Sequence, residues 1–172
     1  QNLERHCQQH GSIRQLLILN SPNNPSGACF TEHELKSLAD VASRYNIIVL
    51  SDEIYSELHY RGNHQSIARY YPDGTIISNG ISKWAGAGGW RLGYFVFPKN
   101  LRAILASMTV IASETFTSVS APVQMAAISA FEGSSEMHEY VLASRNIMSS
   151  IGQTFSRLLI EQGIEVEKPD GG

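Results

Sequence analysis

Short apolar runs, each followed at once by polar residues, constrain this fold more than any other feature of the sequence. Short runs of this kind, bounded by polar residues, predict β-strands. The first three are continuous and rich in Ile and Leu, which is typical of strands buried on both faces of a mainly parallel sheet. The predicted strands are residues 16–19, 47–50, 75–77 and 93–97.

Helical patterns fill most of the remaining chain. A helix is predicted over residues 32–45, because Thr31 and Glu34 have the spacing of a capping box. The order strand, helix, strand is a βαβ unit with a right-handed crossover, so an α/β fold is expected. In the second half, apolar residues recur at helical spacing. The helices predicted there are residues 98–111, 121–131 and 135–162, and residues 164–167 are expected to begin a further strand.

Length and composition narrow the class of protein. The 172 residues are 42% hydrophobic and 17% charged, which suits a folded domain and excludes intrinsic disorder. The net charge of −3 gives no reason to expect nucleic acid or a membrane as a partner. Cys7 and Cys29 are too few for a disulfide framework, so a reduced, cytoplasmic location is expected. His6 and His10 lack the further ligands that a metal site needs, so no metal is expected.

Polar clusters follow the first three predicted strands directly. Residues 20–27 carry amides, residues 51–55 an acid and a phenol, and residues 78–83 an amine. Because ligands bind at the carboxyl ends of parallel strands, the sequence predicts one crevice lined by all three clusters. Each cluster alone is better explained as a loop, a helix cap or solvated surface. Their joint occurrence in this order favours a functional site.

The same clusters carry a family resemblance over nearly the whole chain. Residues 80–83 (GISK) and 89–94 (GWRLGY) resemble the lysine signature of class I and II aminotransferases. Residues 24–27 (NPSG) resemble the Asn-Pro-Thr-Gly turn of that family, and residues 52–55 (DEIY) resemble its Asp-x-x-Tyr motif. The resemblance implies a three-layer fold-type I large domain with a mainly parallel sheet. It also implies the cofactor pyridoxal 5′-phosphate (PLP).

The resemblance assigns a role to each matching residue. Lys83 would form the Schiff base with PLP and then move the substrate proton as general base and acid. Asp52 would pair with the pyridine nitrogen and keep the ring an electron sink. Tyr55 would be the second catalytic residue. Tyr55 and Asn24 would form hydrogen bonds with the phenolic oxygen of PLP. Arg91 would hold the cofactor phosphate.

The sequence also departs from the family pattern. Many relatives carry Ser three residues before the lysine, where this chain has Gly80. Trp84, directly after the lysine, has no role that the resemblance assigns. The family turn commonly contains a cis peptide bond, so the Asn24–Pro25 bond is expected to be cis.

The implied protein is an aminotransferase that moves an amino group between an amino acid and a 2-oxo acid, as a cytoplasmic homodimer. Residues 1–133 are expected to form the C-terminal half of the PLP-binding domain. Residues 134–172 are expected to form a connector helix and the start of a smaller domain. The chain is therefore expected to be a fragment that is inactive alone. A β-lyase, an enzyme like aminocyclopropane-carboxylate synthase, and a non-catalytic regulatory domain are the alternatives.

Overall fold

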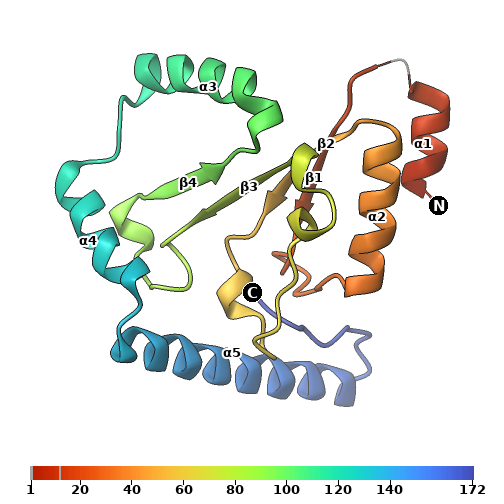
Figure 1. The fold of residues 1–172 in the computed structure, drawn as a ribbon. Coiled ribbons are helices and arrows are strands. Elements are labelled where there is room, and N and C mark those ends of the chain that lie inside the picture. The colour runs from red at the N-terminus through yellow and green to blue at the C-terminus, as the bar shows by residue number, and fades with distance from the viewer. Residues whose placement is uncertain (1, 12) are drawn as a thin grey trace.

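The computed structural model describes residues 2–11 and 13–172, and its centre is a four-stranded sheet with the order β1-β2-β3-β4 (Figure 1). The strands are β1 (Leu16–Asn20), β2 (Ile48–Asp52), β3 (Thr75–Gly80) and β4 (Gly93–Val96). The first three pair in parallel, and β4 pairs antiparallel to β3. The expected α/β class with a mainly parallel sheet is confirmed.

Five α-helices surround the sheet in the described part of the chain. They are α1 (Asn2–His10), α2 (Glu32–Arg44), α3 (Arg102–Thr115), α4 (Ala121–Glu132) and α5 (Ser135–Glu161). Short 3₁₀ turns occupy Ser56–Leu58 (η1), Ile67–Arg69 (η2), Pro72–Gly74 (η3), Gly88–Trp90 (η4) and Lys99–Leu101 (η5).

The predicted capping box starts α2. The Thr31 side chain accepts a hydrogen bond from the backbone N–H of Glu34, and the Glu34 carboxylate accepts one from the backbone N–H of Thr31. Two N–H groups that an α-helix leaves unpaired are thereby satisfied. The buried face of α2, together with α1, covers one face of the sheet. The core there contains Cys7, Leu19, Leu35, Ala39, Ala42, Ile47, Val49 and Ile67.

The opposite face of the sheet is open at its edges, which corrects the expectation of strands buried on both faces. Side chains alternate along a strand, so Leu17 and Leu19 face the helices while Leu16 and Ile18 face away. Leu16 is 58% exposed and Ile18 is 65% exposed. Ile104 and Met108 of α3 line an apolar groove on this face with Leu16, but no described helix covers β1 completely.

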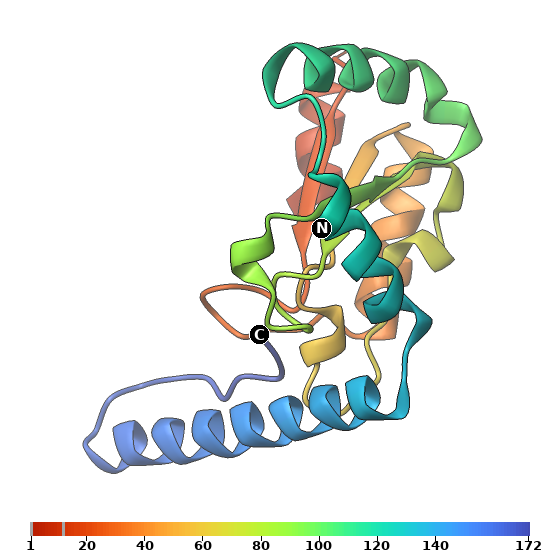
Figure 2. The ribbon, with the colours of Figure 1, turned by 90° about the vertical axis from the view of Figure 1, so that its left-hand side faces the viewer.

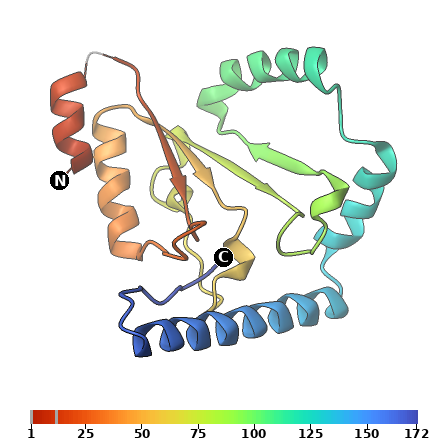
Figure 3. The same cartoon turned by 180° about the vertical axis from the view of Figure 1, so that it is seen from behind.

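Helix α5 runs beneath the edge where the three parallel strands end (Figures 2 and 3). The chain then turns back towards that edge, and Gly171 forms an isolated bridge with His59. Residues 164–167 are not a strand, contrary to the prediction, because their backbone forms no ladder with the sheet. No helix among the described residues is both long and apolar enough to span a membrane.

Candidate active site

Strand register brings the three polar clusters to one edge. In the parallel pair of β1 and β2, Asn20 lies opposite Asp52, and in the pair of β2 and β3, Asp52 lies opposite Ser78. All three strands end at or close to this row, so the loops that follow start side by side. The predicted crevice at the carboxyl ends of the strands therefore has a structural basis.

The carboxylate of Asp52 is held by neutral donors. Asn20 donates from Nδ2 to Oδ2 at 3.2 Å, and the Ser78 hydroxyl donates to Oδ1 at 3.1 Å. The backbone N–H of Ile54 is a longer donor to Oδ1, at 3.4 Å. Because these donors carry no charge, they orient the carboxylate and leave its negative charge available to a cation.

Asn24 and Tyr55 meet across this edge. The Asn24 amide donates from Nδ2 to the phenolic oxygen of Tyr55 at 3.0 Å. Tyr55 is thus an acceptor in this contact, and its own O–H proton stays free for another acceptor. The Asn24–Pro25 bond is cis, as predicted, and the Ser21–Pro22 bond is cis as well.

Lys83 lies in the turn that follows β3, with its side chain exposed. Its Nζ is 5.4 Å from the centroid of the Tyr55 ring, within the range of a cation–π contact. Trp84 points instead into a small apolar cluster with Ile81 and Val141, where it is 7% exposed. The buried indole therefore anchors the turn that presents the Lys83 amine.

Arg91 is placed differently from the other predicted residues. It has a left-handed backbone with φ of 56°, and its guanidinium donates to the carbonyl of Gly88 in the same turn. The side chain is exposed and folds back on its own loop. The structure thus brings together Asp52, Asn24, Tyr55 and Lys83, and it holds Arg91 just before β4.

Comparison with known proteins decides the family. The family description "Aminotransferase class I and II" matches residues 1–172. The chain belongs to this family. Aminotransferases of class I and II are PLP-dependent enzymes of fold type I, so the fold class and family expected from the sequence are confirmed.

Individual aminotransferases show the extent of the similarity. The chain is 36% identical to aspartate aminotransferase of Geobacillus stearothermophilus over 159 residues, which cover 90% of this chain and 39% of that one. It is 35% identical to the probable N-acetyl-LL-diaminopimelate aminotransferase of Bacillus subtilis, in a match that covers 90% of this chain and 38% of that one. The chain thus spans about two fifths of these relatives.

Solved aminotransferase structures share the fold. An aspartate aminotransferase mutant of Thermus thermophilus superposes with a TM-score of 0.86 at 30% identity, covering 98% of this chain and 44% of that one. The aromatic aminotransferase of Pyrococcus horikoshii gives a TM-score of 0.85 at 32% identity, covering 92% of this chain and 42% of that one.

The donor set at the strand edge fits the cofactor of the aminotransferase family. PLP carries a basic pyridine nitrogen, a phenolic oxygen and an aldehyde. The Asp52 carboxyl group suits the first, the free O–H of Tyr55 suits the second, and the exposed amine of Lys83 suits the third. Each group is one that the chain's own hydrogen bonds leave available to a ligand.

The missing serine of the aminotransferase lysine motif has a steric explanation. A Cβ atom at Gly80 would lie 2.6 Å from the carbonyl oxygen of Leu92, because β3 and β4 approach closely there. This backbone therefore has no room for a side chain at Gly80. The hydroxyl of Ser78, two residues earlier in β3, donates to Asp52.

A buried polar network beside the site was missed by sequence reasoning. Glu53 follows Asp52 and accepts hydrogen bonds from Ser51 at 2.9 Å and from Ser66 at 2.5 Å, and it pairs with His64 at 3.2 Å. Burial raises the pKa of Glu53, but His64 and the two hydroxyls together outweigh it, so the pKa lies below its ordinary value. Acidic residues after a strand are common, so the sequence carried no signal for this network.

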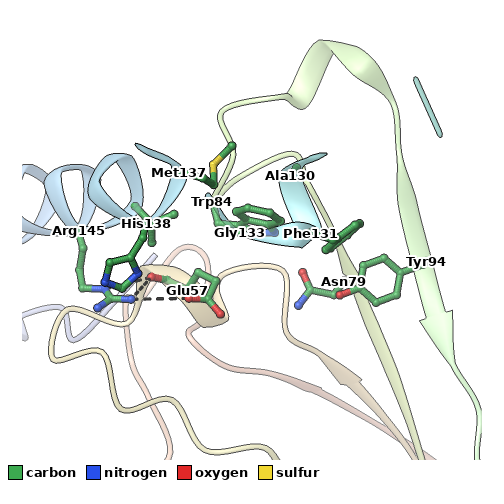
Figure 4. A pocket seen from close by; sticks show the side chains of 11 residues that line it. Glu57, Asn79, Trp84, Tyr94, Ala130, Phe131, Gly133, Met137, His138 and Arg145 are labelled. Carbon is green, nitrogen blue, oxygen red and sulfur yellow. Dashed lines mark hydrogen bonds and ion pairs between the residues drawn. The ribbon is translucent and has the colours of Figure 1, made fainter. Parts of the chain in front are cut away.

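A pocket of about 350 Å³ lies between the sheet, α4 and α5 (Figure 4). Asn79 and Tyr94 come from the sheet, while Trp84 and Phe131 form an apolar wall. Arg145 of α5 donates to the backbone carbonyl of Glu57 at 2.9 Å and thereby fastens α5 to η1. The predicted site residues do not line this pocket, although Trp84, the residue after Lys83, does.

Proposed function

We propose that the protein containing this chain is a PLP-dependent aminotransferase that transfers an amino group between an amino acid and a 2-oxo acid. The observation that carries the proposal is the assembly of Asp52, Asn24, Tyr55 and Lys83 at one edge of the sheet. The family match supports it. Relatives bear names with different substrates, including aspartate and N-acetyl-LL-diaminopimelate, so the proposal concerns the reaction class.

The proposed roles follow from the chemistry of the side chains. PLP, when bound, supplies an electron sink that stabilises negative charge on the substrate α-carbon. Lys83 carries the amine that holds the cofactor and then moves a proton at that carbon through Nζ. Asp52 keeps a negative charge next to the pyridine nitrogen, and its neutral hydrogen-bond donors fix its direction. Tyr55 donates its free O–H to the phenolic oxygen, and Asn24 fixes the position of that phenol.

Arg91 is proposed to bind the cofactor phosphate. Its planar guanidinium suits a phosphate group, and the bond to the Gly88 carbonyl uses one of its nitrogens. We further propose that residues 1–133 belong to the PLP-binding domain and residues 134–172 to a connector helix and the start of a smaller domain. The single uninterrupted helix α5 supports this division.

A homodimer is proposed from the exposed apolar surface. Large apolar side chains of β4 and α3 are exposed, and folded proteins normally cover surfaces of this kind. These side chains are Phe95, Val96, Val110 and Ile111. The cytoplasmic location expected from the cysteine content stays a prediction.

The reaction class is tested with the purified full-length protein that contains this chain and a panel of amino acids and 2-oxo acids. We expect PLP-dependent formation of a new amino acid and a new 2-oxo acid in equal amounts. Lys83→Ala should lower the rate by about 10²–10⁴-fold or more, because the group that moves the proton is lost. Lys99→Ala, at an exposed position in η5, is the matched control and should keep the rate. Production of ammonia without a second amino acid would contradict the proposal.

A further inference from the structure

Asn20, the last residue of β1, contacts both halves of the site. Its Nδ2 group donates to Asp52 twice, at 3.2 Å to carboxylate Oδ2 and at 3.1 Å to the backbone carbonyl. Its Oδ1 accepts from the backbone N–H of Asn24 at 3.1 Å and from the side chain of Asn23 at 3.1 Å. One amide thus links the Asp52 carboxylate to the turn that carries Asn24.

The chemistry of these partners fixes the orientation of the amide. The carbonyl and carboxylate oxygens of Asp52 can only accept, and the backbone N–H of Asn24 can only donate. The nitrogen of the Asn20 side chain must therefore face Asp52, and its oxygen must face Asn24. A side chain at this position needs a donor and an acceptor on one short, planar group, which asparagine supplies and aspartate does not.

We propose that Asn20 is a positioning residue that holds the Asp52 carboxylate and the turn carrying Asn24 at a fixed distance from each other. This inference rests on the proposed binding of PLP, because Asp52 and Asn24 are the residues that would form hydrogen bonds with two different groups of the cofactor ring. Two ring contacts made by separate loops must be held in register, and misplacement by about 1 Å can cost about 100-fold in rate. Asn20 supplies that register through a single rigid group.

A purely structural role for Asn20 predicts something different. The bond from Nδ2 to the backbone carbonyl of Asp52 closes the sheet edge, and its loss alone would lower stability while leaving the affinity of the folded protein for PLP unchanged. The substitution Asn20→Asp separates the two roles. It keeps an acceptor for Asn24 but loses the donor to Asp52 when both carboxyls are ionised. A proton shared by the two carboxyls restores that donor, so the effect of the substitution depends on pH.

The experiment measures the dissociation constant of PLP by absorbance titration in the wild-type protein, Asn20→Asp and Asn20→Ala. We expect Asn20→Asp to weaken PLP binding by about 10- to 100-fold, since a hydrogen bond to a charged group is lost. The loss should be smaller at about pH 6 than at about pH 8, because a proton shared by the two carboxyls at the lower pH restores a donor to Asp52 and the single negative charge of the wild-type pair. Asn20→Ala should weaken binding at both pH values by a similar factor. Asn63→Asp, which adds the same charge in an exposed loop, should bind PLP as the wild type does.

Thermal unfolding of each variant without PLP shows whether it is folded, and Asn20→Ala provides the test if Asn20→Asp does not fold. A wild-type affinity and pH dependence in both Asn20 variants would overturn the inference while leaving the proposed function intact. Equal weakening by Asn20→Asp at both pH values would reduce Asn20 to a structural residue and also overturn it. A wild-type protein that does not bind PLP would instead contradict the proposed function.

Discussion

Asn24 donates a hydrogen bond to the phenolic oxygen of Tyr55 at 3.0 Å, across 31 positions of the sequence. The contact joins the loop after β1 to the segment after β2. It uses the lone pair of the phenol and leaves the phenolic proton free, so Tyr55 can donate to a ligand while Asn24 holds it in place. Lys83 lies over the same ring, which makes Tyr55 the residue that connects the amide and the amine.

Removing the Tyr55 hydroxyl should change the bound cofactor more than the fold. Tyr55→Phe keeps the ring beneath Lys83 but loses the proton donated to the phenolic oxygen of PLP. We expect the pH at which the absorption band of bound PLP changes to rise by about one to two units, since a hydrogen bond to a charged group is worth about 1.5–3 kcal/mol. Tyr45→Phe, at the end of α2, is the control and should leave the midpoint where it is. An unchanged midpoint in Tyr55→Phe would remove Tyr55 from the cofactor site.

Trp84 should contribute to stability through burial. It is 7% exposed and packs with Ile81 and Val141, and its ring is 5.7 Å from that of Phe131. Trp84→Ala should lower the free energy of unfolding by about 3–5 kcal/mol, as large cavities in a core do. Trp90, which is 54% exposed, is the matched control, and Trp90→Ala should cost less than about 1 kcal/mol. Equal losses in urea denaturation would contradict the anchoring role of Trp84.

Gly80 should tolerate no side chain. Gly80→Ala would place a Cβ atom 2.6 Å from the carbonyl oxygen of Leu92, and backbone on both sides would have to move. The expected cost in unfolding free energy is about 1–3 kcal/mol. A Cβ atom at Gly89 would meet no other atom within 4 Å, so Gly89→Ala should change stability by no more than about 0.5 kcal/mol. A Gly80→Ala protein as stable as the wild type would show that β3 and β4 can separate at this position without cost.

Stability should depend on the ionisation of Glu53. Its pKa is lowered in the folded protein, so the folded state binds fewer protons at this group than the unfolded state does. The stabilisation is therefore full above the ordinary pKa of a glutamate and is lost as the pH falls through the lowered pKa. Glu53→Gln should remove this pH-dependent part. Glu165→Gln, at an exposed position, should keep it, and parallel pH profiles of all three proteins in urea denaturation would contradict the assignment.

The sequence predicted the local elements better than the long-range contacts. Thr31 and Glu34 are neighbours in the chain, so their capping box could be predicted from spacing alone. The row of Asn20, Asp52 and Ser78 depends on strand register. The short apolar runs indicate which strands are adjacent, but they do not show which residues lie opposite each other. The role of Asn20 was missed for this reason.

Tertiary packing explains the remaining differences. The sequence predicted that Leu16 and Ile18 are buried, but both are exposed in the structure. A short apolar run does not show which face of a strand is covered. Residues 164–167 have an apolar and charged alternation that suits a strand, yet no edge of the sheet lies beside them. No reason for a tryptophan at position 84 was evident from the sequence. The structure gives one, because Trp84 packs against side chains of α4 and α5.

Lys83 is the residue proposed to hold PLP, and borohydride reduction tests this assignment most directly. The protein is loaded with PLP, reduced, digested and mapped by mass spectrometry. We predict a phosphopyridoxyl group on Lys83, with Lys36, Lys99 and Lys168 unmodified. A label on one of those three lysines and none on Lys83 would contradict the account.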